Sequence, residues 1–234
     1  MKKTFALSLI GITLLSCSTS LDGEGVATAQ KNFTVDQITE LDISCNCNVT
    51  LIPGNTVGVK IESHQNIIDN LKVEASKGSV KIDENKQVGQ FSAYDVFVYV
   101  TRDLKEIEIN KQTALKVSGT LNVDDLIIET NDQSKISDTY LITNNLKLTT
   151  SDQSYNQLNG TSISLVYKGE NQSKSDLFTF ETNDAQVFIS DNAILNINSR
   201  KSLAGSAKGN SVVTYIGEPS KDTKISDNAQ VLKK

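Results

Sequence analysis

The chain has 234 residues and a formal net charge of −5, from 23 basic and 28 acidic side chains. One histidine, three cysteines and no tryptophan leave few of the side chains that usually serve as general bases or metal ligands. The acidic balance argues against a nucleic-acid partner. The chain carries no phosphate-binding loop, dinucleotide fingerprint or nucleophile elbow, so we expect neither an enzyme nor a cofactor.

Residues 1–16 have the pattern of a signal peptide. Two lysines precede an apolar stretch, residues 5–15, that is too short to cross a bilayer of roughly 30 Å as a permanent helix. The stretch ends in Leu14-Leu15-Ser16-Cys17, which resembles a bacterial lipobox. The resemblance implies that Cys17 is acylated and becomes the first residue of the mature chain, and Ser18 after it implies transit to the outer membrane. The alternative is an ordinary secretory signal with a chance cysteine.

Residues 17–30 contain small, polar and acidic side chains without an apolar period. We therefore expect a flexible tether of about a dozen residues between the membrane and the fold. The folded domain is predicted to span residues 31–234.

Apolar and polar residues alternate between Leu41 and Leu51, which is the period of a β-strand and predicts that the apolar set is buried. Further strands are expected at residues 57–61, 80–82 and 96–100. Only residues 65–71 read as a helical turn, so an α/β fold is excluded.

Cys45 and Cys47 fall on the buried side of the first of these strands. Because an i to i+2 span is near the limit of disulfide reach, we favour buried thiols over a disulfide bridge. The third alternative is a soft metal site completed by His64. On its own, His64 is expected in a loop.

A fixed period appears after residue 103. Leu126–Ser134 recurs as Leu146–Ser154 and again as Leu165–Ser173, at intervals of about twenty residues. Phe178–Gln186 reads as a fourth copy that follows after a shorter arc. Each unit is a short strand followed by an Asn/Asp corner and cannot bury its apolar side alone, so the repeat predicts an all-β fold whose C-terminal half is a β-solenoid with about 20 residues per coil. Leu148 is predicted to point inward and Lys147 outward.

Several segments together resemble the putative auto-transporter adhesin, head GIN domain family over about residues 24–234. They are the acidic-glycine tether, the strand pattern that opens at Phe33, and three runs: Asn66–Leu71, Leu104–Ile109 and Val212–Pro219. The resemblance implies a right-handed single-stranded β-helix in a Bacteroidota lipoprotein. One departure is that Thr-Asn-Asp and Thr-Ser-Asp stand where that family typically has Ser-Gly corners, and only Gly169 keeps the glycine.

The corner acids allow a second interpretation. Asp132, Asp152, Asn171 and Asp184 would stack about 4.8 Å apart and could collect a hard cation such as Ca²⁺. Corners explain these residues better, because Asn and Asp side chains bond their own backbone in turns. A catalytic carboxylate pair would have to come from Asp124-Asp125 or from the stacked corners, and the only guanidinium groups are Arg102 and Arg200.

The sequence therefore predicts a membrane-anchored cell-envelope lipoprotein that acts as a non-enzymatic interaction or adhesion module. Its expected partners are the membrane, through the lipid anchor, and a glycan or surface protein. The alternative is a glycan-binding or glycan-processing accessory lipoprotein.

Overall fold

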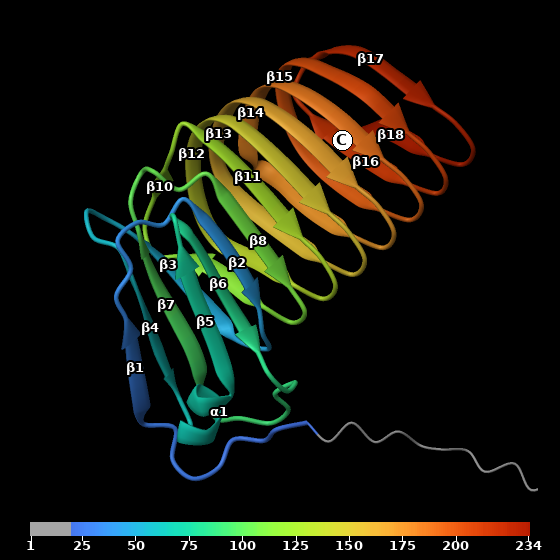
Figure 1. Cartoon of the computed structure of the whole chain (residues 1–234). Helices are drawn as coiled ribbons and strands as arrows, with labels where there is room; N and C mark the ends of the chain where they lie inside the picture. The colour runs from blue at the N-terminus through green and yellow to red at the C-terminus, as the bar shows by residue number, and fades with distance from the viewer. Residues whose placement is uncertain (1–19) are drawn as a thin grey trace, which may run out of the picture.

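The computed structural model describes residues 20–234 and is almost entirely β (Figure 1). Strands account for 63% of the residues and helix for 3%, which confirms the all-β prediction. The predicted signal peptide and Cys17 lie outside the described residues. Among residues 20–234, no helix is both long and apolar enough to cross a membrane.

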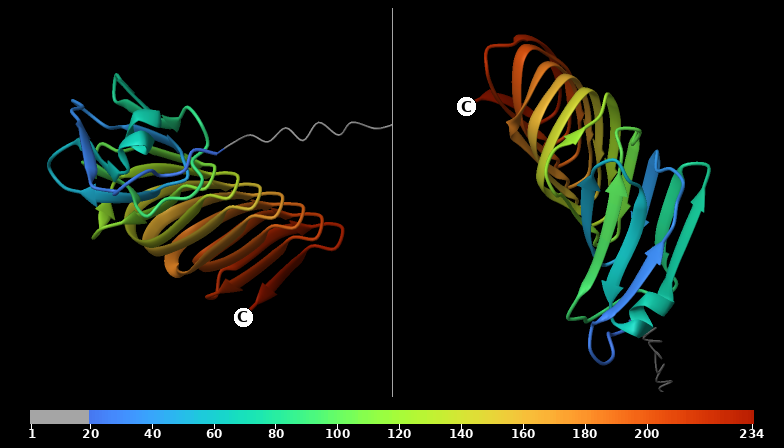
Figure 2. Two further views of the ribbon diagram at one scale, coloured as in Figure 1. Left: turned by 90° about the horizontal axis from the view of Figure 1, so that it is seen from below. Right: turned by 90° about the vertical axis from the view of Figure 1, so that its left-hand side faces the viewer.

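The C-terminal part is a β-solenoid of about six turns, with equivalent residues about 20 apart, as the repeat predicted. Figure 2 shows the coils stacked along one axis, with the C-terminus at the end away from the N-terminal part. Its strands are β8 (Glu106–Asn110), β9 (Ala114–Val117), β10 (Leu121–Asn122), β11 (Asp125–Thr130), β12 (Lys135–Thr150), β13 (Tyr155–Gly169), β14 (Lys174–Ile189), β15 (Ile194–Ala207), β16 (Val212–Ile216), β17 (Ser220–Ile225) and β18 (Gln230–Lys233).

Each coil contributes to two main parallel sheets. One of them, here called the first sheet, runs through β2, β8, β11, the C-terminal parts of β12 to β15, and β17. The second sheet runs through β3, β9, the N-terminal parts of β12 to β15, β16 and β18. A polar corner joins the end of each first-sheet strand to the start of the next second-sheet strand.

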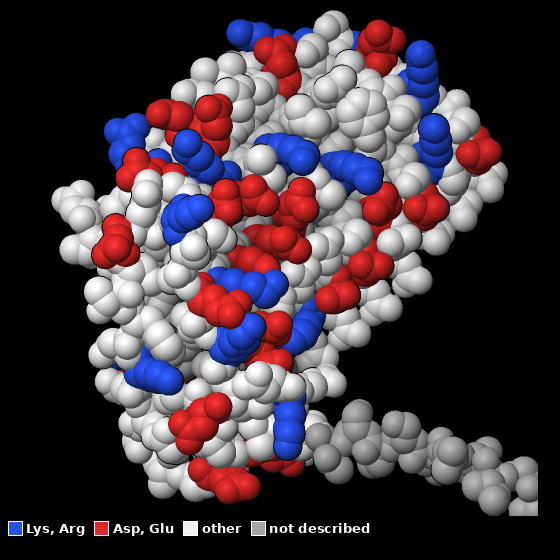
Figure 3. Space-filling model, viewed as in Figure 1, with Lys and Arg blue, Asp and Glu red and all other residues white. Residues whose placement is uncertain are grey.

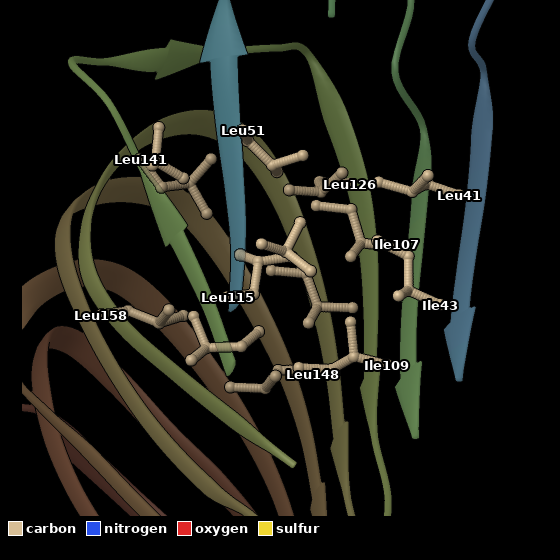
Figure 4. Close-up of a cluster of buried hydrophobic side chains, with 14 of the residues drawn as sticks. Leu41, Ile43, Leu51, Ile107, Ile109, Leu115, Leu126, Leu141, Leu148 and Leu158 are labelled. Atoms are coloured by element: carbon tan, nitrogen blue, oxygen red, sulfur yellow. The ribbon is translucent and has the colours of Figure 1, made fainter. Parts of the chain in front are cut away.

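Residues of the same kind stack along the axis. Leu126 pairs with Leu146, which pairs with Leu165, and Leu148 pairs with Tyr167 in the same parallel register. Figure 4 shows leucine and isoleucine side chains of successive coils meeting between the two sheets. Leu148 is fully buried whereas Lys147 is exposed, which confirms the predicted inward and outward directions.

The N-terminal part, here called the head, closes one end of the solenoid with antiparallel strands. It comprises β1 (Ala29–Phe33), β2 (Glu40–Ser44), β3 (Asn48–Pro53), β4 (Gly58–Ser63), α1 (Gln65–Asn70), β5 (Leu71–Ser76), β6 (Ser79–Glu84) and β7 (Tyr94–Val100). In the first sheet β6 pairs with β2 in parallel and carries β5 antiparallel at the edge, while in the second sheet β7, β4 and β1 extend the sheet beyond β3. The predicted helical turn is α1, which buries Ile67 and Ile68.

One strand prediction for the head needs correction. The strand expected from Leu41 to Leu51 is two strands, because the chain turns a corner between Ser44 and Asn48 and passes from the first sheet to the second. The predicted alternation still holds, since the apolar residues on both sides of the corner are buried.

The segment expected as a free tether is fastened to the head from Leu21 onward. Leu21 forms a β-bridge with Val88, the Gly23 amide donates to the Gln90 carbonyl, and residues 29–30 already belong to β1. The expected flexible tether is thus corrected for residues 21–30, since tertiary hydrogen bonds hold a run that has no hydrophobic period of its own.

The fourth copy of the repeat does not lie at Phe178–Gln186. Leu165 pairs with Ala185, and Tyr167 pairs with Val187, so the true copy is Ala185–Ala193, at the same twenty-residue spacing. Phe178–Gln186 begins on the other side of the coil. Phe180 is fully buried, but Phe178 is only half-buried, and no shortened arc exists at this point.

Candidate functional site

The corners of successive coils form a column on one side of the molecule. At each corner one residue has a left-handed backbone, with φ between 58° and 68°; these residues are Lys111, Asp132, Asp152, Asn171, Asp191, Gly209 and Asp227. Asn, Asp and Gly tolerate this conformation best, which explains why acidic and amide residues dominate the column.

The corner aspartates also connect neighbouring coils. The amide of Lys111 donates to Asp132 Oδ2 at 2.8 Å, the amide of Asn171 donates to Asp191 Oδ2 at 3.2 Å, and the amide of Gly209 donates to Asp227 Oδ2 at 3.1 Å. Each carboxylate therefore accepts a backbone hydrogen that its neighbouring coil leaves free. This supports the interpretation of the corner acids as turn-forming residues.

The structure brings together three of the four residues of the predicted column. Asp132 and Asp152 are successive members, and Asn171 Nδ2 donates to Asp152 Oδ1 at 3.1 Å. Asp184 is elsewhere: it lies between Ser164 and Ser202 in the first sheet, and Ser202 Oγ donates to it at 2.7 Å. The column's member from that coil is Asp191, and the misplaced fourth repeat is the cause of the error. Within residues 20–234, no group of three or more His, Cys, Asp or Glu side chains is placed to hold a metal ion.

A second column of side chains, which the sequence analysis missed, runs beside the first. The residue after each left-handed position carries an amide, and all seven are exposed: Gln112, Gln133, Gln153, Gln172, Asn192, Asn210 and Asn228. We call these seven residues the amide ladder. The signal was present in the repeated Asp-Gln-Ser triplet, but only the stacking of the coils reveals a continuous exposed column.

A groove of about 330 Å³ lies at the head end of the amide ladder. It is lined by Asn46, Glu84, Gln87, Lys111, Gln112, Asp132 and Gln133. Glu84 is buried, and its carboxylate accepts the Asn46 amide at 2.9 Å and the Val88 amide at 3.3 Å. Lys111 Nζ donates to Asp83 at 2.8 Å. The groove is therefore rich in amides and carboxylates and contains one ammonium group, which is already paired.

The two head cysteines hold one wall of this groove. Cys45 and Cys47 form a disulfide with their Cα atoms 5.3 Å apart, and both are buried. The favoured prediction of free thiols is thus wrong, because the corner between β2 and β3 supplies the local bend that an extended strand lacks. The bridge flanks Asn46, whose Nδ2 donates to the Val88 carbonyl at 3.1 Å.

His64 lies in the loop between β4 and α1, as expected, and it does not join the cysteines in a metal site. It precedes α1 and is buried, with Nδ1 3.2 Å from the Glu24 carbonyl and Nε2 3.2 Å from the Ser92 amide. Because the Ser92 amide can only donate, Nε2 is an acceptor and Nδ1 carries the hydrogen given to Glu24. His64 therefore fastens the segment before β1 to the head.

The outer side of the first sheet is acidic near the head, and Figure 3 shows acidic side chains gathered over β2 and β8 with lysines among them. Glu106 lies beside Glu40 in register, and Glu108 lies beside Glu129. Partial burial raises the pKa of Glu106, and the neighbouring carboxylates of Glu40, Glu129 and Glu108 raise it further. This face therefore repels anionic partners.

Of the residues considered for glycan cleavage, Asp132 lines the groove, but Asp124, Asp125 and the two arginines do not. Arg102 reaches Asp124 at 3.8 Å, and Arg200 donates to Glu181 at 2.8 Å, both in exposed ion pairs. Asp125 accepts the Asn145 side-chain amide at 2.6 Å. These groups already have partners on the surface of the solenoid, away from the groove's lining.

Comparison with known proteins agrees with this architecture. A putative adhesin from Bacteroides fragilis has 14% sequence identity and a TM-score of 0.84, over 92% of this chain and 100% of the other. A putative lipid binding protein from Parabacteroides distasonis has 13% identity and a TM-score of 0.76, over 92% and 99%. A putative adhesin from Parabacteroides merdae has 14% identity and a TM-score of 0.64, over 92% and 98%. At these identities the likeness concerns the fold alone.

No curated protein is similar enough in sequence to count as a match. The family profile described as putative auto-transporter adhesin, head GIN domain matches residues 37–219, most of the chain, which confirms the resemblance drawn from the sequence. The chain therefore belongs to the putative auto-transporter adhesin, head GIN domain family.

Proposed function

We propose that the mature chain is a membrane-anchored lipoprotein of the outer membrane that acts as a non-enzymatic adhesion module. The observation that carries the proposal is the repetition of the same exposed corner along the stack, from Gln112 to Asn228. A surface built from repeats offers many weak contacts in parallel, and parallel contacts add to strong attachment without a deep pocket. The family's description as an adhesin supports the same role.

The anchor is expected at Cys17, because Leu14-Leu15-Ser16-Cys17 follows a signal-like apolar stretch. Each buried methylene contributes about 0.8 kcal/mol to membrane association, so two or three acyl chains form a durable anchor. Leu21, the first of the described residues that bridges to the head, comes four residues after Cys17, and an extended chain spans at most about 3.6 Å per residue. The head is therefore held within about 14 Å of the anchor.

This short connection also gives the molecule an orientation. The described chain enters beside α1, and the C-terminus lies at the far end of the solenoid (Figure 1). We infer that the head faces the membrane and that the coils project away from it. The repeated corners are then presented along the length of the projection.

Fractionation of cells tests the anchor. The native chain is expected in the membrane fraction, with an acyl mass on its N-terminal peptide, whereas Cys17→Ala is expected in the soluble fraction or as uncleaved precursor. Ser18→Ala is the matched control and should keep the anchor. A native chain that stays in a detergent-free supernatant without an acyl mass would show that the lipoprotein proposal is wrong.

Beads coated with the purified chain test the adhesive role. They are expected to attach to bacterial or host cell surfaces more often than beads coated with albumin. The same chain should release no products from polysaccharides during prolonged incubation. Equal attachment of both kinds of bead, or steady product release, would contradict the adhesive, non-enzymatic role.

A further inference from the structure

We propose that the amide ladder and the groove at its head form a binding surface for an uncharged polysaccharide chain. The inference rests on the proposed adhesive role and names the ligand class and the residues that would bind it. The chain of sugars would lie along Gln112, Gln133, Gln153 and Gln172, with one end in the groove.

The turn itself does not require the amides of the ladder. The left-handed residue of each corner explains the preference for Asp, Asn or Gly at that position, but glutamine has no comparable role in the position that follows. Four successive coils nevertheless place glutamine there, and three more place asparagine. Core packing does not explain this choice either, since all seven side chains are exposed.

Hydrogen bonding within the ladder explains only some of these amide side chains. Asn228 Nδ2 donates to Asn210 at 3.1 Å, and Asn210 Nδ2 donates to Asn192 at 3.2 Å, so the far end of the ladder is internally paired. At the head end only a 3.4 Å contact joins Gln112 to Gln133. In the part of the chain that the structure describes, the side chains of Gln153 and Gln172 make no hydrogen bond.

The middle of the ladder therefore presents unused donors and acceptors at the spacing of stacked strands, about 4.8 Å. A primary amide offers two N–H donors and a carbonyl acceptor. A sugar hydroxyl also both donates and accepts, so a row of amides can bind a row of hydroxyl groups. A linear polysaccharide supplies such a row, whereas a single small molecule would reach only one or two coils.

The groove lies at one end of the same surface. Its volume lies within the range of about 300–1,000 Å³ typical of small-ligand sites, and Gln112 and Gln133 belong to both features. Each oxygen of the Glu84 carboxylate accepts one backbone hydrogen, which leaves acceptor capacity for a ligand hydroxyl. The Cys45–Cys47 disulfide fixes the corner that carries Asn46, so this wall is preorganised.

Charge and backbone pairing select among ligand classes. The corner carboxylates and the acidic first sheet disfavour anionic polysaccharides and nucleic acids. An extended peptide would need free backbone groups, but the corners pair with one another: the Gln133 amide donates to the Lys111 carbonyl, and the Gln153 amide donates to the Asp132 carbonyl. Uncharged hydroxyl-rich chains remain the ligands that these side chains fit.

Affinity electrophoresis tests the proposal. The purified mature chain is run through native gels that contain mannan, laminarin, xylan or dextran, with alginate as the anionic comparison. We expect retardation by at least one uncharged polysaccharide. The triple variant Gln133→Ala/Gln153→Ala/Gln172→Ala should bind that polysaccharide at least about tenfold more weakly, since three amide hydrogen-bond sites are lost.

The matched control is Gln157→Ala/Gln186→Ala/Gln230→Ala, which makes the same chemical change at exposed strand positions away from the ladder. Its affinity should stay within about twofold of that of the native chain. Both triple variants should have the same melting temperature as the native chain. The proposal is wrong if no uncharged polysaccharide retards the native chain, if only alginate does, or if the two triple variants lose affinity equally.

The bead assay separates this inference from the adhesive role. If beads coated with the ladder variant attach to cells as well as native beads, adhesion stands and the ladder is not its binding surface. The opposite outcome is that native beads fail to attach, while the gel retards the native protein but not the ladder variant. That outcome would support the polysaccharide site and contradict the adhesive role.

Discussion

The head and the solenoid hold their side chains in place in different ways. In the solenoid the same contact returns coil after coil, as in the stack of Leu126, Leu146 and Leu165. In the head each contact occurs once: one disulfide between Cys45 and Cys47, and one histidine between α1 and the segment before β1. A repeated contact has a copy above and below, whereas a single contact has no substitute.

This difference separates two kinds of function within one continuous fold. Each solenoid coil contacts only its neighbours, so its surface can be extended or varied one coil at a time. The head must close the end of the stack, hold the entering chain and shape the groove, and it does so with residues that no repeat supplies. Changes in stacked positions should therefore disturb a coil and its neighbours, while changes in the head should release a particular segment.

The largest effect is expected from a charge placed in the solenoid stack. Leu148 is fully buried between Ile128 and Tyr167 in register. Leu148→Asp should lower the free energy of unfolding by at least about 4 kcal/mol, because the carboxylate has no partner in the core. Chemical denaturation monitored by circular dichroism measures the change.

The neighbouring residue provides the control for this change. Lys147 is exposed and lies 3.6 Å from Glu129. Lys147→Asp should cost less than about 1 kcal/mol, because exposed ion pairs contribute little. Similar losses at both positions would mean that the repeated stack does not carry the stability of the coils.

A smaller loss is expected at Gly160, whose backbone leaves no room for a side chain. Gly160 has a φ of 121°, and a Cβ at this position would overlap the carbonyl oxygen of Leu141 on the preceding coil. Gly160→Ala should therefore cost about 3 kcal/mol in unfolding free energy. Gly54→Ala is the comparison, since a methyl group there would meet no atom within 4 Å, and it should be close to neutral. Equal melting temperatures for the two variants would contradict the close packing of successive coils.

A change in the head should act locally. His64→Ala removes the hydrogen bonds to the Glu24 carbonyl and the Ser92 amide, at a cost of about 2 kcal/mol. Hydrogen exchange should become much faster at Leu21 and Gly23 and stay unchanged in β13 to β15. Gln65→Ala, at an exposed neighbour, should leave exchange at Leu21 as it was. Protection that persists in His64→Ala would show that other contacts suffice to hold the entering segment.

The difference between the repeated solenoid and the unrepeated head also explains what could be predicted from the sequence. The twenty-residue period fixes the stacking of Leu126, Leu146 and Leu165, because one register buries all of them together. The same reasoning failed at Phe178, since each coil contains two apolar strand segments that look alike, and local alternation cannot tell which sheet a segment joins. Small Ala185, at the true position, is a weaker apolar signal than the phenylalanines.

The head was less predictable for a physical reason. The bridge between Cys45 and Cys47 requires a corner that alternation alone does not reveal, and the burial of His64 depends on residues 24 and 92. The groove brings together residues 46, 84 and 112, which are far apart in the chain. Singular tertiary contacts of this kind leave no period in the sequence, whereas the corner acids were found because they repeat.

The smallest effect should come from the corner column, where the turn and not a charge is needed. Asp132 accepts the Lys111 amide and has a φ of 59°, both of which asparagine can reproduce. The free energy of unfolding of Asp132→Asn should therefore stay within about 0.5 kcal/mol of the native value. Weaker repulsion by Asp152 favours a small increase. Asp132→Ala should lower the free energy of unfolding by about 1–2 kcal/mol, since alanine neither accepts the hydrogen bond nor favours this backbone.

Thermal melts with Ca²⁺ and with chelator complete the test of the corner column. A rise of several degrees in the native melting temperature with Ca²⁺, abolished in Asp152→Asn, would mean that the column binds a cation and that its acids are more than turn residues.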